Sequence, residues 1–165
     1  MIIRTFRLSK GLAGLAFCFA LFCLCVSLVE AQISIVVANS SPQAKAKDDN
    51  ANAEVKKLLK AIFEAEKLKW PNGDKVQIAD QPKTEISKAF YEKFIGKSAK
   101  KVRMKWMKLV LSGQANAPTK CKNDAAVKEA VSKNPNTVGY ISTESLDDSV
   151  KEILRLESAD LAKGK

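Results

Sequence analysis

Seven polar side chains follow apolar, β-branched runs or lie at the start of a helical pattern, where proteins often bind small ligands. They are Asn39, Ser40, Ser41, Thr84, Ser87, Ser142 and Thr143. In open α/β sheets, ligands bind beyond the carboxyl ends of the strands. Hydroxyl groups there, together with the unpaired N–H groups of a helix start, can hold an oxyanion. We therefore predict that these stretches converge on one oxyanion site, to which Lys83 could add a positive charge.

Each stretch also has a purely structural interpretation. Thr84 has the residue type and position of a helix N-cap, and Ser142-Thr143 is an ordinary turn sequence. Glu85 argues against a bound anion, because its carboxylate would already interact with the helix dipole and would repel a phosphate. The sequence leaves the binding and the structural interpretations open.

Catalytic and metal sites find little support. The chain contains no histidine, which removes histidine acid–base catalysis, Ser-His-Asp triads and the commonest zinc ligand. Walker loops, GxGxxG fingerprints, metal-spaced acids and nucleophile elbows are also missing from the sequence. We predict that the protein is not an enzyme and that it uses no cofactor and no metal. We expect Cys121, which lies among lysines, to be a solvent-exposed thiol, the alternative being a thiol with a lowered pKa.

Apolar periodicity predicts the first elements that would position these residues. Residues 32–39 form an uncharged, β-branched run that predicts a central strand covered on both faces. Residues 55–63 have the spacing of an amphipathic helix. Trp70-Pro71-Asn72-Gly73-Asp74 predicts a tight turn, and residues 76–78 alternate as in a short strand.

The second half of the chain alternates between helix and strand patterns. Helices are expected after the caps Thr84, Ser98 and Asn123. Residues 137–141 predict a third strand, in which Gly139 indicates a close approach of neighbouring backbone or a kink. Residues 150–156 fit a strand or a helix equally well. Strands separated by helices predict an α/β fold with a mostly parallel sheet and flanking helices.

The first 31 residues have the pattern of a cleaved export signal. Basic residues precede an apolar run at 12–29, and Val29-Glu30-Ala31 supplies small residues where a signal peptidase cleaves. A retained anchor is the alternative, since about 18 apolar residues can span a bilayer. We predict a signal peptide at 1–31 and a single domain at 32–165, with a frayed tail beyond Ser158. We also predict no membrane span after cleavage and a periplasmic or secreted location.

The chain is strongly basic, with a net charge of +10, which favours association with anions of many kinds. Lys97, Lys101, Lys105 and Lys108 repeat along one side of the helix that is expected after Ser98. This lysine stripe is either a solvated helix face or a contact for an anionic surface such as lipid, cell-envelope polymer or nucleic acid. Because no arginine–aromatic interleaving accompanies it, we expect no nucleic-acid partner.

Six short motifs occur in an order that is known from one protein family. They are Ala61-Ile62-Phe63 with Trp70-Pro71-Asn72-Gly73, Lys88-Ala89-Phe90-Tyr91, Gly96-Lys97-Ser98, Trp106 with Leu111-Ser112-Gly113, Pro118, and Asn134-Pro135-Asn136-Thr137-Val138-Gly139-Tyr140-Ile141. This order resembles the phosphate-type substrate-binding proteins of ABC importers, and in particular their short, one-lobed members. The likeness covers nearly all of residues 33–156. Residues 81–87 lack the glycine of the Ser-Gly-Thr turn that two-lobed phosphate binders carry there.

The resemblance implies a single lobe of a type II periplasmic-binding-protein-like fold, with phosphate or a related oxyanion as the ligand. One lobe lacks the second jaw that normally encloses the ligand. The resemblance therefore implies weak binding or dependence on an envelope protein partner. The alternative function is an envelope scaffold or protein-interaction domain that keeps the fold and binds no solute.

Overall fold

The structure is a computed structural model that describes residues 32–45 and 52–156. These residues belong to the second of two units into which the chain divides, residues 31–165. The predicted signal peptide and the tail beyond Ser158 lie outside the described residues. Among the described helices, none combines the length and the apolar character that a membrane-spanning segment needs.

The described residues alternate between strands and helices for much of their length. In chain order the elements are β1 (Ile33–Ala38), the 3₁₀ helix η1 (Pro42–Lys45), α2 (Asn52–Phe63), β2 (Gln77–Asp80), α3 (Glu85–Ala89), the π-helix η3 (Phe90–Ile95), α4 (Ala99–Leu111), β3 (Thr119–Lys120), α5 (Asp124–Lys133), β4 (Thr137–Ser142), the 3₁₀ helix η4 (Thr143–Ser145) and β5 (Val150–Leu156). The stretch at 150–156, which fitted a strand or a helix equally well, is therefore a strand. The two-residue strand β3 and the helix η1 were not predicted.

The predicted helix caps are confirmed. The side chains of Thr84, Ser98 and Asn123 each accept a hydrogen bond from a backbone N–H in the first turn of the next helix, at 3.3, 3.4 and 3.0 Å. Gly96 follows η3 with a left-handed φ of 75°, a conformation that glycine adopts without strain. These local signals fix where α3, α4 and α5 begin.

The sheet is mixed, with the strand order β3-β2-β4-β1-β5. β2 runs parallel to β3 and β4, whereas β1 runs antiparallel to β4 and β5. The prediction of a mostly parallel sheet is wrong because β1 enters the sheet in the direction opposite to its neighbours. β1 is nonetheless the central strand that was expected, and all six of its residues are buried.

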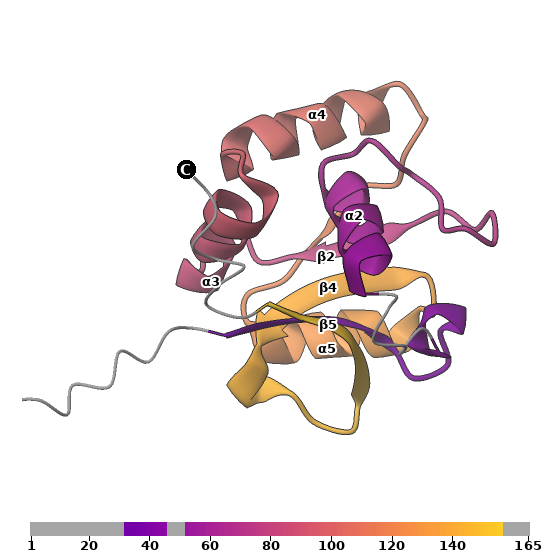
Figure 1. Ribbon diagram of the computed structural model, residues 1–165. Coiled ribbons are helices and arrows are strands. Elements are labelled where there is room, and N and C mark those ends of the chain that lie inside the picture. Colours follow the sequence, from indigo (N-terminus) through magenta and orange to yellow (C-terminus); the bar gives the residue numbers. More distant parts are fainter. Residues whose placement is uncertain (1–31, 46–51, 157–165) are drawn as a thin grey trace, which may run out of the picture. The chain divides into compact units, whose positions relative to one another are not determined.

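Helices cover both faces of the sheet. α2, the segment α3–η3 and α4 lie on one face, and α5 lies on the other (Figure 1). Successive strand residues point to opposite faces, so Ile35 joins the core under α2 and α4 while Val36 joins the core under α5. The described members of these two cores all belong to the second unit of the chain. This unit therefore encloses a hydrophobic core of its own.

Gly139 does mark a close approach, but side chains rather than the predicted backbone lie next to it. A Cβ atom at this position would lie 2.5 Å from Cγ1 of Val127 and 3.3 Å from Cβ of Ala79 and Cγ2 of Val131. Real side chains do not approach to 2.5 Å, so a larger residue here would push α5 away from the sheet. The absence of a side chain at Gly139 lets α5 pack directly on β4.

Candidate functional site

The direction of β1 separates the predicted site residues into two groups. Ile33, at the start of β1, pairs with Ser142 at the end of β4, whereas Ala38 pairs with Val150 at the start of β5. The stretch Asn39-Ser40-Ser41 therefore lies with the amino ends of β2 and β4, away from their carboxyl ends. We call these two sides of the sheet, where the strands begin and end, its amino edge and its carboxyl edge. The expected convergence of all three stretches is wrong, because it assumed that the three strands run the same way.

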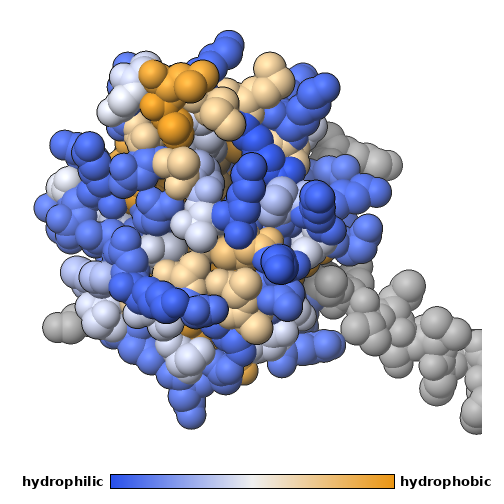
Figure 2. Space-filling view, turned by 180° about the vertical axis from the view of Figure 1, so that it is seen from behind, coloured by the Kyte–Doolittle hydropathy of each residue, from blue (hydrophilic) through white to orange (hydrophobic). Residues whose placement is uncertain are grey.

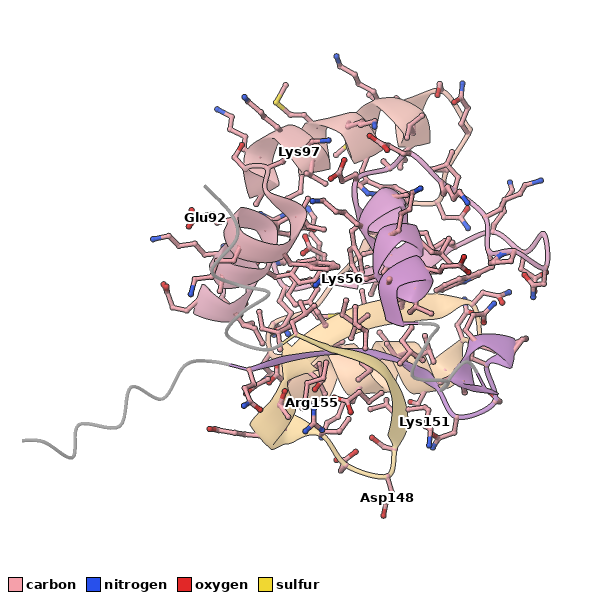
Figure 3. The ribbon with its side chains drawn as sticks, in the orientation of Figure 1. Lys56, Glu92, Lys97, Asp148, Lys151 and Arg155 are labelled. Carbon is pink, nitrogen blue, oxygen red and sulfur yellow. The ribbon has the colours of Figure 1, made fainter. Side chains whose placement is uncertain are left out.

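The stretch after β1 makes local contacts at its own edge. Asn39 donates from Nδ2 to the carbonyl oxygen of Asp148 at 2.7 Å. Asp148 lies in the loop before β5 (Figure 3). Ser41 is buried, and its hydroxyl donates to Oε1 of Gln43. Ser40 is exposed. These contacts account for Asn39 and Ser41 as turn residues.

Thr84, Ser87, Ser142 and Thr143 do lie at one edge of the sheet. Thr84 donates its hydroxyl to the carbonyl oxygen of Gln81 at 3.1 Å. The Thr143 hydroxyl is hydrogen bonded to that of Ser34 at 2.8 Å, so the start of β1 takes part in this edge. Sequence reasoning missed Ser34 because it placed the start of β1 at the opposite edge.

A buried carboxylate lies at the centre of this edge. Asp80, the last residue of β2, is 4% exposed. Ala79 pairs with Gly139, so Asp80 and Tyr140 follow on adjacent parallel strands and point to the same face. Oδ1 of Asp80 accepts hydrogen bonds from the hydroxyls of Tyr140 at 2.7 Å and Tyr91 at 3.3 Å.

Arg103 reaches this carboxylate from α4. It donates from Nε to Oδ2 of Asp80 at 2.7 Å and from Nη2 to Oδ1 at 3.2 Å, a bidentate arrangement. Nη2 also donates to the Ser87 hydroxyl at 2.8 Å, and the guanidinium carbon lies 5.0 Å from the centroid of the Tyr91 ring. The Arg103 side chain is still 32% exposed, and Nη1 takes no part in the hydrogen bonds of the described residues. The guanidinium of Arg103 is therefore held by Asp80 and Ser87, while part of the side chain reaches the surface.

A second carboxylate joins the same edge from the start of α5. The side chain of Gln81 donates from Nε2 to Oδ1 of Asp124 at 2.7 Å and to the carbonyl oxygen of Tyr140 at 2.9 Å. Oδ2 of Asp124 accepts from the backbone N–H of Ser142 at 3.0 Å. Asp124 and Asp80 thus bind hydrogen-bond donors that would otherwise be available to a ligand.

The residues around Asp80 are of types that are rare in this chain, a signal that sequence reasoning overlooked. Tyr91 and Tyr140 are the two tyrosines of the whole sequence, and Arg103 is one of two arginines after residue 31. Neither Asp80 nor Arg103 was singled out from the sequence. Asp80 and Arg103 are 23 positions apart in the sequence, so no local pattern could predict their contact.

The pKa values of the cluster follow from burial and from the charge of Asp80. Burial, and then the negative charge of Asp80, raise the pKa of Tyr91 well above its ordinary value, and the same causes raise the pKa of Tyr140. Burial works to lower the pKa of Arg103, but the hydrogen bond and the charge of Asp80 outweigh it and leave that pKa raised. Near neutral pH the tyrosines are therefore neutral donors and Arg103 is a cation.

These raised tyrosine pKa values predict the response of the protein to alkali. A group whose pKa is higher in the folded than in the unfolded state favours folding below its ordinary value, here 10, and disfavours folding as the pH rises above it. We expect no tyrosinate absorbance near pH 10, and then its appearance together with the loss of circular dichroism. Chain unfolded in guanidinium, as the control, should titrate at the ordinary value. Tyrosinate formation in protein that keeps its native circular dichroism would contradict this burial.

Cys121 differs from both sequence expectations. The side chain is buried rather than exposed. Desolvation, and then the negative charge of Asp80, raise the pKa of the thiol, whereas a lowered pKa had been the alternative. The neighbouring residues Lys120 and Lys122 are exposed, so their charges are solvated and do not stabilise a thiolate. Cys121 is part of the core under α5.

Comparisons with known proteins bear on the fold. No family model and no curated protein sequence matches the chain. A solved structure from Clostridium perfringens, described as a phosphate ABC transporter substrate-binding protein with bound phosphate, matches with a TM-score of 0.51 and 17% identity over 74% of this chain and 45% of that chain. An ABC-type phosphate transport receptor from Vibrio cholerae matches with a TM-score of 0.53 and 20% identity over 74% of this chain and 47% of that chain.

The matched part thus spans less than half of each of these solved chains. At these identities the likeness shows a shared fold. The described residues form an α/β body with a mixed sheet and flanking helices, similar to part of the fold of phosphate transport substrate-binding proteins.

Proposed function

We propose that the protein binds a small oxyanion, with phosphate as the first candidate, at the carboxyl edge of β2 and β4. The observation that carries the proposal is the Arg103 side chain, which is partly exposed and whose guanidinium is held by Asp80 and Ser87. A guanidinium offers planar donors that match the geometry of an oxyanion, and fixing it beforehand lowers the ordering cost of binding. Thr84, Ser87 and Ser142 would supply polar contacts beside it. A protein of the same fold has been solved with bound phosphate.

The neighbouring carboxylate favours a protonated ligand. Asp80 is bound to the same guanidinium, and an ionised carboxylate accepts hydrogen bonds but cannot donate them. An oxyanion that retains a proton can donate to such a group, whereas a fully deprotonated one is repelled by it. Phosphate retains a proton near neutral pH and sulfate does not, so the proposed site prefers phosphate.

The chain offers one open edge, so we propose that binding is weak or is completed by an envelope protein partner. In this proposal residues 1–31 direct export, and residues 32–165 act as one domain in the periplasm or outside the cell. The mass of the exported protein tests the cleavage site.

The melting temperature of the protein tests the ligand. We expect phosphate to raise it more than sulfate or chloride does at matched ionic strength. At about a hundred times Kd, binding to the folded state alone adds about 2.7 kcal/mol of stability. The variant Arg103→Lys keeps a positive charge near Asp80 but loses the planar N–H donors of the guanidinium. It should therefore lose most of the rise in melting temperature that phosphate causes. Ser40→Ala, at the opposite edge, is the matched control and should keep it.

An equal response to the three salts would contradict the proposal, since ionic screening alone would then explain the stabilisation. One observation favours that outcome and the second candidate function, an interaction or scaffold domain that binds no solute. Asp80 and Asp124 already accept hydrogen bonds from Arg103, Tyr140 and the N–H of Ser142. In a scaffold protein these carboxylates would permanently occupy the hydrogen-bond donors that a ligand would otherwise bind.

A further inference from the structure

The large apolar side chains that stay exposed in the described part of the chain all lie on one helix. Met104, Met107 and Leu111 of α4 are 52%, 54% and 81% exposed. Their spacing of three and four residues places them along a single stripe, which we call the outer stripe. The opposite side of α4 contributes Val102 and Trp106 to the core. Orange and pale-orange side chains gather at the top of Figure 2, where α4 lies.

Unpaired positive charge borders the outer stripe. Lys100, Lys101 and Lys108 are exposed, and none of them takes part in an ion pair among the described residues. Lys100 and Lys108 each lie four positions from Met104, so they neighbour it on the helix surface. Lys105, by contrast, lies 3.8 Å from a carboxylate oxygen of Glu66. The sequence of α4 contains no acidic residue.

We propose that the outer stripe and its three lysines dock the protein on an anionic phospholipid surface. An apolar stripe flanked by lysines is the pattern of helices that lie in the membrane interface, and anionic headgroups attract each basic side chain near the surface. Methionine and leucine enter the boundary between headgroups and acyl chains. The lysine stems lie along this boundary with their ammonium groups among the phosphates.

The residues on α4 favour lipid over a protein partner. Protein interfaces depend on aromatic and arginine anchors, and on α4 these face inward: Trp106 donates to the carbonyl oxygen of Phe63 and Arg103 binds Asp80. The outer stripe offers flexible side chains without a fixed shape. Its border carries charge of one sign, which complements a uniformly anionic surface and gives no pattern that would fix the register of a protein.

Docking on lipid involves other side chains than the proposed oxyanion site, because the Arg103 guanidinium is held by Asp80 whereas the side chains of Met104, Met107 and Leu111 are exposed. A lipid headgroup and free phosphate nevertheless share their chemistry. Binding to vesicles must therefore be compared with and without free phosphate at matched ionic strength. We expect free phosphate to leave vesicle binding unchanged.

Sedimentation with lipid vesicles tests the proposal. The chain from Gln32 to Lys165 is used, since it encloses its own core and lacks the apolar run at 12–29. We expect it to bind phosphatidylcholine vesicles that contain phosphatidylglycerol and not vesicles of phosphatidylcholine alone. The variant Lys100→Glu/Lys108→Glu should bind at least about thirtyfold more weakly. Met107→Ser/Leu111→Ser should bind about tenfold more weakly, because it removes the apolar contact.

The matched control is Lys122→Glu/Lys151→Glu, which changes the net charge equally at two exposed lysines on other elements. Lys151 lies on β5, away from α4 (Figure 3). This pair should lower binding less than about threefold. All three pairs are surface changes, and an unchanged melting temperature should show that each variant is folded.

Four outcomes would overturn docking by the outer stripe. If the control pair lowered vesicle binding as much as Lys100→Glu/Lys108→Glu does, binding would depend on the net charge of the protein and not on the lysines beside the outer stripe. Full binding by Met107→Ser/Leu111→Ser would show that no apolar side chain enters the membrane. Displacement by free phosphate would place the headgroup contact at the oxyanion site. A failure of the wild-type chain to bind either vesicle would leave a protein partner as the occupant of the stripe.

Discussion

Replacing Asp80 with alanine is expected to lower the free energy of unfolding by about 3 kcal/mol. The change leaves the inner side of Arg103 without its counter-charge and the hydroxyls of Tyr91 and Tyr140 without their acceptor. Removing one partner of a buried pair costs about 3–5 kcal/mol. The lower end applies because the Arg103 side chain is 32% exposed and water can solvate part of its charge. Urea denaturation at neutral pH measures the loss.

A double-mutant cycle separates the pairing from the packing. Asp80→Asn keeps an acceptor for Tyr140, so it should cost less than Asp80→Ala. Arg103→Met leaves Asp80 buried and unpaired, and it should also destabilise. The double variant Asp80→Asn/Arg103→Met should cost less than the sum of its single changes, because groups in direct contact are coupled. Additive costs would show that the ion pair contributes nothing to stability and would weaken its role as a fixed anchor for an oxyanion.

Replacing Phe90 with alanine is expected to cost about 4 kcal/mol. Phe90 is fully buried and stacks on Tyr140 at a centroid distance of 4.1 Å and an interplanar angle of 7°. Its ring also packs against Phe63 in a T-shaped arrangement, with a centroid distance of 4.7 Å. The substitution removes these contacts and leaves a cavity behind the tyrosine whose hydroxyl binds Asp80. Guanidinium denaturation followed by circular dichroism measures the change.

Phe90→Leu is the matched variant, since it fills most of the same volume without the stacked ring. It should cost less than about 1.5 kcal/mol. Equal costs for the two variants would mean that the ring stack, rather than the filled volume, determines the stability at this position. A loss below about 1 kcal/mol for Phe90→Ala would contradict the tight packing around Tyr140.

Local signals in the sequence predicted the elements well. Thr84, Ser98 and Asn123 cap helices as expected, since a cap depends on contacts within one turn. The run Ile33–Ala38 is a doubly buried central strand, because an uninterrupted apolar run is stable only with both faces covered. Gly139 was correctly predicted to mark a close approach.

Strand direction could not be predicted in the same way. A doubly buried run such as Ile33–Ala38 has no polar face and looks the same from either end, so nothing in it specifies parallel or antiparallel pairing. The long connection from β1 to β2 permits both. Because β1 runs in the other direction, Asn39, Ser40 and Ser41 lie away from the predicted site, and the three predicted stretches do not converge.

The candidate site itself is built from contacts between distant residues. Asp80 and Arg103 belong to different elements, and Asp80 and Tyr140 are 60 positions apart. Each has a plain local interpretation as a strand end, a helix cation or a strand aromatic. The register of β2 against β4 brings Asp80 and Tyr140 together, and the packing of α4 brings Arg103 to Asp80. Cys121 shows the same limit, because its lysine neighbours are exposed while its own side chain turns into the core under α5.

The place of β1 in the sheet has a consequence for how the chain is made. β1 holds the first residues of the sheet to leave the ribosome, yet both of its partners, β4 and β5, come from residues 137–156. Pairings of such high sequence separation form slowly. During synthesis, β1, an interior strand of the sheet, cannot pair until residues 137–156 have been made. If the chain is exported as proposed, it would therefore remain unfolded enough to pass through a translocation pore until β5 had been made.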